Sequence, residues 1–199
     1  MDLFAIPIHH GKLDLPLDNL RNRLDNLFQQ CDRGVWAGET GLSTGQLGLD
    51  LHQYPEVSSL VDALMPRVHE YWEVLRYVPA TLEVESCWAN QHSVGDRTQE
   101  HGHCDGHRQT HVASVFYVEK AEGADLEFIN PLDYIHKMTP LAGEQGDMLM
   151  SESIPSKTGD FFLFPGWMRH RTSPTTVSYT HLRAHETVLD LVCRLLLEK

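Results

Sequence analysis

The sequence predicts a single α+β domain in which two N-terminal helices brace a jelly roll of short strands. Three features of its 199 residues carry this prediction. Apolar residues recur at helical spacing before residue 78, the period changes to two at Leu82, and later apolar segments are short and separated by Gly, Pro, Asp and Asn. Many short strands at such spacing are typical of closed or double-sheet β folds. A chain of this length can bury a core without disulfides.

Two amphipathic segments predict the helices. The first begins at about Pro16, and the second runs from Glu56 to Tyr77 with Pro66 as a kink or an early end. The apolar face of the first consists of Leu20, Leu24, Leu27, Phe28 and Cys31. The apolar face of the second consists of Leu60, Leu64, Val68, Trp72 and Leu75. We expect residues 34–48, between the helices, to form a loop that carries no readable function.

The predicted strands follow from alternation and from short apolar runs. Residues 82–90 alternate strictly, and residues 3–8 resemble an edge strand in which Pro7 is tolerated. The remaining predicted strands span residues 112–118, 124–129, 134–138, 148–154, 161–164 and 168–172.

Charge and composition limit the partners. A formal charge of −12 without a basic run argues against a nucleic-acid partner, because polyanion binding needs clustered Lys and Arg. No apolar stretch of membrane-spanning length and no signal peptide is visible, so we expect a cytoplasmic protein without a membrane partner. The four cysteines lack a C-x-x-C spacing and are expected to be thiols. A small-molecule or peptidyl substrate remains compatible, and the oligomeric state is open.

The chemistry of the chain is concentrated in residues 101–107, His-Gly-His-Cys-Asp-Gly-His. In an extended backbone His103 and Asp105 point to the same side, because strand side chains alternate with period two. A second histidine from a distant strand, for which His170 is the candidate, would complete a 2-His-1-carboxylate triad. Such a triad leaves coordination positions open on a non-heme Fe(II).

Several further motifs, in order, resemble those of the small Fe(II)- and 2-oxoglutarate-dependent oxygenases of bacteria and phages, which are related to prolyl hydroxylases. The resemblance covers Trp88 to Pro174. It rests on Trp88-Ala89-Asn90 with Gly95-Asp96, Gln99 ahead of His101-Gly102-His103, Ser114-Val115-Phe116-Tyr117, Pro155 with Gly159-Asp160, and Phe164-Pro165-Gly166-Trp167 followed by His170.

The resemblance implies a double-stranded β-helix, Fe(II), 2-oxoglutarate as cosubstrate and hydroxylation of a C–H bond. Prolyl hydroxylases carry H-x-D where small phage-type members carry H-x-H, and this chain offers both. We assign His103, Asp105 and His170 as ligands, because one anionic oxygen ligand suits this iron, with His101 as the alternative. Asn90 and Tyr117 are candidate contacts of 2-oxoglutarate. Trp88 and Trp167 are expected to wall the site.

Two other functions share the predicted fold and the histidines. One is a cupin-like metal enzyme that does not use 2-oxoglutarate, and the other is a non-catalytic jelly-roll binding module. The His-x-Asp element with a distant histidine favours the oxygenase over the binding module, which needs no metal triad.

The end of the chain has a different character. Residues 177–187 and 191–199 resemble a one-frame translation of a sequencing adapter, with Val188 and Leu189 at the place of its variable index. We therefore predict an oxygenase-like domain at residues 1–176 and a non-native tail at 177–199. The last strand of the jelly roll, with the basic residue that such enzymes place there for 2-oxoglutarate, is expected to be missing. An amphipathic C-terminal helix through Leu189, Val192 and Leu195 is the competing interpretation.

Overall fold

A computed structural model of the chain describes residues 5–36, 38–104, 110–120, 122–133, 150–176 and the backbone of 186–196. The helices α1 (Asp18–Phe28) and α2 (Pro55–Val74) lie where the sequence predicts them. Helix α2 continues through Pro66, so this residue is not the predicted early end of the helix. Its flanking residues Leu64 and Val68 are buried against the core, and their packing offsets the hydrogen bond that proline removes.

Six strands form the larger antiparallel sheet, in the order β1-β7-β4-β9-β3-β2. Their bounds are β1 His9–Lys12, β2 Leu42–Ser43, β3 Thr81–His92, β4 Thr110–Glu119, β7 Asp160–Pro165 and β9 Glu186–Leu196. The three-stranded sheet has the order β6-β5-β8, with β5 Leu126–Ile129, β6 Ser151–Ile154 and β8 His170–Thr172. The chain passes from the large sheet at β4 to the small sheet at β5, returns at β7, and crosses again at β8. Such alternation is expected of a jelly roll.

The edge strand expected at residues 3–8 is displaced. The structure places β1 at His9–Lys12, paired with β7, whereas residues 5–8 have no strand partner. Pro7 has no N–H for a sheet ladder, which favours pairing further along the chain. The strand predicted at 134–138 lies outside the described residues. Residues 34–48 contain β2 and the 3₁₀ helix Thr44–Leu47, and a second 3₁₀ helix spans Leu51–Gln53.

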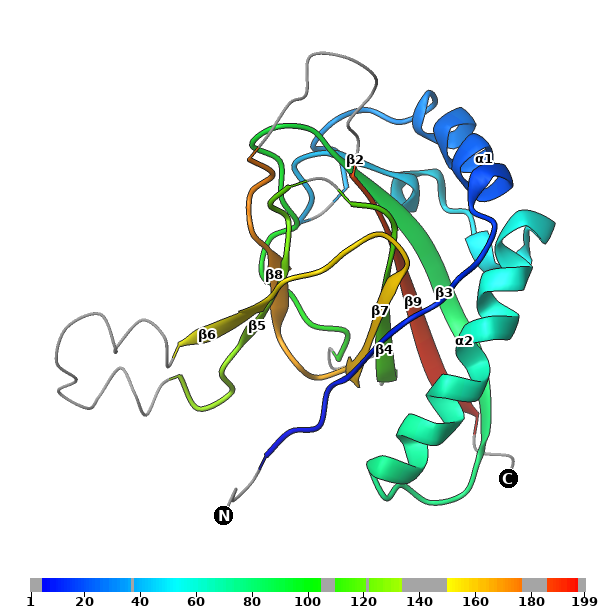
Figure 1. The fold of residues 1–199 in the computed structure, drawn as a ribbon, viewed down its shortest axis with the longest axis vertical. Coiled ribbons are helices and arrows are strands. Elements are labelled where there is room, and N and C mark those ends of the chain that lie inside the picture. The colour runs from blue at the N-terminus through cyan, green and yellow to red at the C-terminus, as the bar shows by residue number, and fades with distance from the viewer. Residues whose placement is uncertain are drawn as a thin grey trace, which may run out of the picture.

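Two hydrophobic cores lie on opposite faces of the large sheet. Helices α1 and α2 cover one face, and the small sheet lies on the other (Figure 1). Strand β4 contributes side chains to both cores, because successive side chains of a strand point to opposite faces. Val112, Phe116 and Val118 pack toward the helices. Ala113, Val115 and Tyr117 pack toward the small sheet. The second core, between the sheets, is the one that borders the candidate site.

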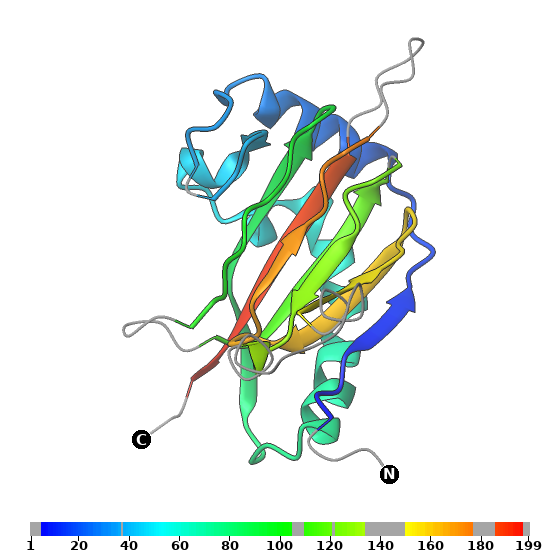
Figure 2. The same cartoon turned by 90° about the vertical axis from the view of Figure 1, so that its left-hand side faces the viewer.

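The expected absence of a last strand differs from the structure. Residues 186–196 form β9, which pairs antiparallel with both β3 and β4 near the middle of the large sheet (Figure 2). This backbone is a strand and not the competing C-terminal helix. Strand pairing uses main-chain N–H and C=O groups, which every non-proline residue carries, so an open slot between two strands accepts many sequences. The pairing therefore follows from main-chain groups and does not depend on the origin of this sequence.

Neither helix of the described chain is both long enough and apolar enough to cross a membrane.

The packing of α2 generates a first prediction. Replacing the fully buried Leu64 with Ala removes core contacts and leaves a cavity, so it should lower the free energy of unfolding by about 2–5 kcal/mol. The matched control is Ser59→Ala on the exposed face of the same helix, expected within about 0.5 kcal/mol of the wild type. Urea unfolding followed by circular dichroism measures both, and equal stabilities would contradict this account of the helix face.

An ion pair joins β5 to β8 and generates a second prediction. Arg171 binds Glu127 in bidentate fashion, with both N–O distances at 2.7 Å. This hydrogen-bonded pairing holds the pKa of Glu127 below its usual value of 4.5, against an opposing effect of burial. Because the folded-state pKa is depressed, the pair stabilises the fold above pH 4.5, and this contribution is lost as the pH falls through the folded-state pKa.

Glu127→Gln should therefore lower the free energy of unfolding at pH 7 by about 1 kcal/mol or less, since the Arg171 side chain is 42% exposed and solvent screens the pair. The difference from the wild type should shrink as the pH falls toward 3. Glu70→Gln is the control, because Glu70 forms an exposed pair with Arg67 on α2. Urea unfolding of the wild type and both variants at pH 7 and at pH 3 measures these differences in the free energy of unfolding. A difference that grows toward low pH would have the wrong sign.

Candidate metal centre

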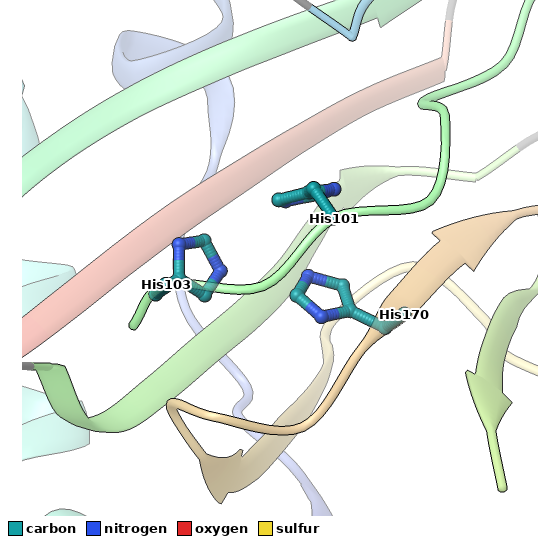
Figure 3. A group of neighbouring side chains, drawn as sticks. All are labelled: His101, His103 and His170. Carbon is teal, nitrogen blue, oxygen red and sulfur yellow. The ribbon is translucent and has the colours of Figure 1, made fainter. Parts of the chain in front are cut away.

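Three histidines from two chain segments gather between the sheets. His101 and His103 lie on the segment after β3, and His170 begins β8. Main-chain hydrogen bonds join the segments: His101 N donates to His170 O at 3.0 Å, and His170 N donates to His101 O at 2.9 Å. This antiparallel bridge fixes the two imidazoles side by side, as Figure 3 shows.

The rings converge closely. The ring centroids of His101 and His170 are 4.3 Å apart, and His103 lies 5.1 Å from each of them. One ring nitrogen from each histidine lies within 4.8 Å of the other two. A point about 2.8 Å or less from all three atoms therefore exists, since 4.8/√3 is about 2.8. Zinc–imidazole bonds of about 2.0–2.1 Å set the scale for a bound metal. If each nitrogen moved up to about 0.7 Å toward that point, all three would lie within that range.

Backbone carbonyls orient two of the rings. Nδ1 of His170 lies 3.0 Å from Met168 O, and Nδ1 of His101 lies 2.9 Å from Gln99 O. A carbonyl can only accept, so the proton resides on Nδ1 and the lone pair on Nε2. The buried Nε2 of His170 has no hydrogen-bond partner in the described part of the chain. A buried lone pair without a donor is the arrangement that a metal ion would satisfy.

The surroundings keep these imidazoles neutral. Burial lowers the pKa of His103 to about 3, and the neighbouring His101 adds to the effect. Burial also lowers the pKa of His170 well below its usual range, reinforced by His101 and His103. The pKa of His101 is lowered by burial, although the Gln99 carbonyl and Glu39 oppose the shift. Neutral imidazole is the form that binds metals, so all three side chains are ready as ligands at neutral pH.

Close backbone packing and aromatic rings complete the site. His103 N donates to Gly166 O at 2.8 Å, in the turn before β8. A Cβ at Gly166 would lie 2.1 Å from Thr110 O, so only glycine allows this turn to pack against β4. The ring of Trp88 lies 5.9 Å from that of His103, as expected of a wall residue. Trp167 is 45% exposed, so much of its side chain faces solvent.

The other residues that the sequence suggested for the site lie in several different places. Asp105 lies outside the described residues, and so does His107. Tyr117 is fully buried between the sheets, where its hydroxyl donates to Ala124 O at 3.1 Å. Asn90 is buried near the end of β3, on the strand face shared with Trp88 by alternation. His111, the next histidine along the chain after His107, is not among the residues assigned to the site; it packs against Trp72, at 5.8 Å between ring centroids, on the helix side and away from the cluster.

Cavities flank the histidines. A hollow of about 10 Å³ lies against His101, His170 and Val115, close to the volume that one water molecule needs. A polar cleft of about 440 Å³ lies next to it, and the two share Thr98, Arg171 and Thr172. Arg97, Gln99 and Glu127 contribute to the lining of this cleft.

Sequence reasoning missed a second group of buried polar residues beside the cluster. His92 Nε2 lies 2.6 Å from Glu39 Oε1, and both side chains are almost fully buried. Glu39 belongs to the segment that the sequence predicts to be a loop without readable function. No local sequence pattern around Glu39 predicts that its side chain is buried, because this burial arises only from tertiary packing.

The comparisons agree with this geometry. Residues 86–183 match a family model described as "Putative 2OG-Fe(II) oxygenase". No curated protein matches the chain in sequence. Among solved structures, a prolyl-4-hydroxylase from Pseudomonas putida is similar over 96% of this chain and 93% of its own, at 13% identity and a TM-score of 0.61.

Two further solved structures are similar to this chain. HygX from Streptomyces hygroscopicus, bound to nickel, 2-oxoglutarate and hygromycin B, is 14% identical over 94% of this chain and 82% of its own, with a TM-score of 0.59. A prolyl hydroxylase from Trichoplax adhaerens, in complex with a peptide fragment, is 13% identical over 94% and 82%, with a TM-score of 0.61. At such identities the likeness shows the fold. Together with the family match, it identifies residues 86–183 as a domain of the 2OG-Fe(II) oxygenase family, which uses Fe(II) and 2-oxoglutarate.

Proposed function

We propose that this chain is a dioxygenase that hydroxylates its substrate with Fe(II) held by His103, His170 and His101. The observation that carries the proposal is the convergence of three ring nitrogens within 4.8 Å. When bound, the iron and 2-oxoglutarate supply the activation of O2 that C–H hydroxylation requires. Three protein ligands leave further coordination positions open for such chemistry.

The protein's own residues would orient the ligands and exclude water. The Met168 and Gln99 carbonyls hold the His170 and His101 rings with Nε2 toward the centre. Phe164 covers one side, with its ring 4.7 Å from that of His170. Trp88 covers His103. Such fixed geometry reduces the reorganisation needed when the cosubstrate and substrate bind.

Asp105 remains the competing third ligand. The sequence assignment of His103, Asp105 and His170 rests on the preference of this iron for one anionic oxygen ligand. The support for His101 is its convergence with His103 and His170 among the described residues, which do not include Asp105. The two sets share His103 and His170, so single replacements at the other two positions distinguish them.

The ligand prediction follows from this competition. His101→Ala should abolish stoichiometric Fe(II) binding because it removes one of three converging nitrogens, whereas Asp105→Asn should bind Fe(II) within a few-fold of the wild type. Anaerobic titration of the purified variants with Fe(II) measures both affinities. The reverse pattern, with binding lost only in Asp105→Asn, would establish the His-x-Asp set and exclude His101.

Asn90 and Tyr117 are the proposed contacts of 2-oxoglutarate within the chain. Both are buried: Tyr117 lies in the core between the sheets, and Asn90 lies near the end of β3, next to Ala89, which packs toward the helices. The Tyr117 hydroxyl donates to Ala124 O at 3.1 Å, so it would have to exchange this hydrogen bond in order to donate to 2-oxoglutarate, whose oxygens only accept. Asn90 could both donate and accept.

The tail bears on cosubstrate binding. We infer that residues 177–199 derive from adapter sequence and that the basic partner expected for the far carboxylate of 2-oxoglutarate is lost with the native strand. β9 supplies main-chain pairing in that place, but main-chain pairing does not replace a guanidinium. The sequence domain limits of 1–176 and 177–199 are part of the same inference.

The affinity for 2-oxoglutarate tests this inference. Losing one partner of a buried charge pair costs about 3–5 kcal/mol, which corresponds to roughly two to four orders of magnitude in dissociation constant. The chain as written should bind 2-oxoglutarate that much more weakly than a version carrying the uninterrupted gene's C-terminus, and should form little succinate. Titration of the Fe(II)-loaded proteins and a succinate assay measure this. Equal affinity and robust turnover in both would show that residues 177–199 are functional protein.

The substrate class is proposed only broadly, as a small molecule or a peptidyl side chain. One structural neighbour carries hygromycin B and another a peptide fragment, so the shared fold accommodates both classes. The family match favours the oxygenase over a cupin-like enzyme without 2-oxoglutarate, and the three-histidine cluster favours a metal enzyme over a binding module.

A further inference from the structure

A buried carboxylate and imidazole lie beside the histidine cluster, outside the set of candidate ligands. Glu39 comes from the segment after α1 and lies outside the family-matched region, whereas His92 ends β3 within it. The side chain of His92 is 0% exposed and that of Glu39 is 1% exposed. Burying a carboxylate is costly unless its oxygens are hydrogen-bonded, so its surroundings need an explanation.

Four donors satisfy the Glu39 carboxylate. Oε1 accepts hydrogen bonds from the backbone N–H groups of Thr40 and Gly41, at 3.0 and 3.2 Å, and lies 2.6 Å from His92 Nε2. Oε2 accepts a hydrogen bond from the Thr98 hydroxyl at 2.7 Å. The first three donors lie on the loop and on β3. The fourth is the only one of them on the segment that leads to His101.

Main-chain bonds attach this loop to the ligand-bearing segment. Gln99 N donates to Gly38 O at 2.6 Å, and Thr40 N donates to Arg97 O at 3.2 Å. Gln99 is also the residue whose carbonyl orients the His101 ring. The loop therefore lies along one edge of residues 97–99, and its contacts reach His101 through the Gln99 carbonyl.

Strand β8 lies along the other edge of the same segment. Thr98 N donates to the Thr172 hydroxyl at 2.9 Å, and Thr172 N donates to Thr98 O at 3.2 Å. The His101–His170 bridge continues this pairing. Thr98 is thus bound on one side by Glu39 and on the other by Thr172, two residues beyond His170.

We propose that Glu39, held by His92, is a positioning residue that fixes Thr98 and so sets the spacing of His101 and His170 for metal binding. The inference rests on the proposed function, since it concerns the same metal centre. Glu39 and His92 touch neither the metal position nor substrate. They act through Thr98 and the main chain of residues 97–101. Partners behind metal ligands typically change metal affinity by about 10–100-fold when they are removed.

The test uses a pair of isosteric replacements. Thr98→Val removes the hydroxyl that binds Glu39 but keeps the shape and the main-chain bonds of the residue. Thr44→Val is the control: its buried hydroxyl accepts a hydrogen bond from Ala89 N at 2.9 Å and donates to Ala89 O at 3.4 Å, on the β2–β3 side of the fold. The Thr98 hydroxyl likewise has two polar partners, Glu39 Oε2 and His92 Nε2, so both variants should lose similar thermal stability.

Titration of the full chain with Co(II), followed by its visible absorption spectrum, reports affinity and ligand geometry. Thr98→Val should bind Co(II) about 10–100-fold more weakly than the wild type with an altered spectrum, and Thr44→Val should match the wild type in both. Glu39→Gln should behave like Thr98→Val. Wild-type affinity and spectrum in Thr98→Val would overturn the positioning role, as would an equal loss in Thr44→Val.

A measurement without metal separates this inference from the proposed function. Amide hydrogen exchange of the metal-free protein should be faster at the His101 and His170 N–H groups in Thr98→Val than in Thr44→Val, because the bridge between them loses its support. Unchanged exchange at both groups would overturn the inference even if the wild type binds Co(II). A wild type that fails to bind Co(II) would contradict the metal centre itself, whatever the exchange rates show.

Discussion

The pairing of the His101 and His170 main chains is the interaction on which the candidate site depends. It joins a segment that follows β3 to a strand about seventy residues later, and it places two imidazoles with their centroids 4.3 Å apart. His103 adds the third ring from the same segment, with its N–H bound to Gly166 O. A metal site assembled in this way needs no long flexible side chain. The positions of its ligating rings follow from the positions of the backbone, which are well determined in a paired sheet.

The two-sheet arrangement explains why this pairing can be rigid. The helices pack on the outer face of the large sheet, and a separate set of apolar residues fills the space between the sheets. Phe164 and Phe128 belong to that inner core and contact His170 through ring packing. The site is therefore bordered by packed side chains, which resist changes of rotamer and also depress the pKa of the imidazoles through burial.

The region around the histidines has two parts that differ in charge: the neutral imidazoles and the Glu39 carboxylate behind them. The cluster itself holds neutral imidazoles, of which His170 is buried and His101 and His103 are partly buried, and an anionic ligand or cosubstrate would interact more strongly with a bound cation there than in bulk water. Behind it, Glu39 is a buried carboxylate whose hydrogen bonds all go to the loop, to β3 and to Thr98. The Glu39 carboxylate is thus fully paired, whereas the histidine cluster offers a buried ring nitrogen at the point where a metal would lie. This nitrogen is the Nε2 of His170, which has no hydrogen-bond partner among the described residues.

Local patterns in the sequence were sufficient for the helices, for most of the strands and for singling out His103 and His170, whose side chains the structure brings together. Helical spacing predicted α1 and α2, because an amphipathic helix must place its apolar residues on one face. The aromatic run 161–164 predicted β7, and residues 101–107 showed where the ligating side chains are concentrated. Asp105 lies outside the described residues, so the choice between it and His101 stays a prediction.

Only the tertiary structure decided which residues meet. The pairing of His101 with His170 depends on register between distant segments, and the local sequence of neither segment specifies a partner. The burial of Glu39 and His92 likewise arises where a loop closes on β3, and a glutamate in a glycine-rich loop has no local mark of burial. In the last strand, by contrast, the pairing depends on the main chain and not on particular side chains. Residues 186–196 pair with β3 and β4 through main-chain groups common to all such segments, so the fold accepts a strand there irrespective of what its sequence resembles.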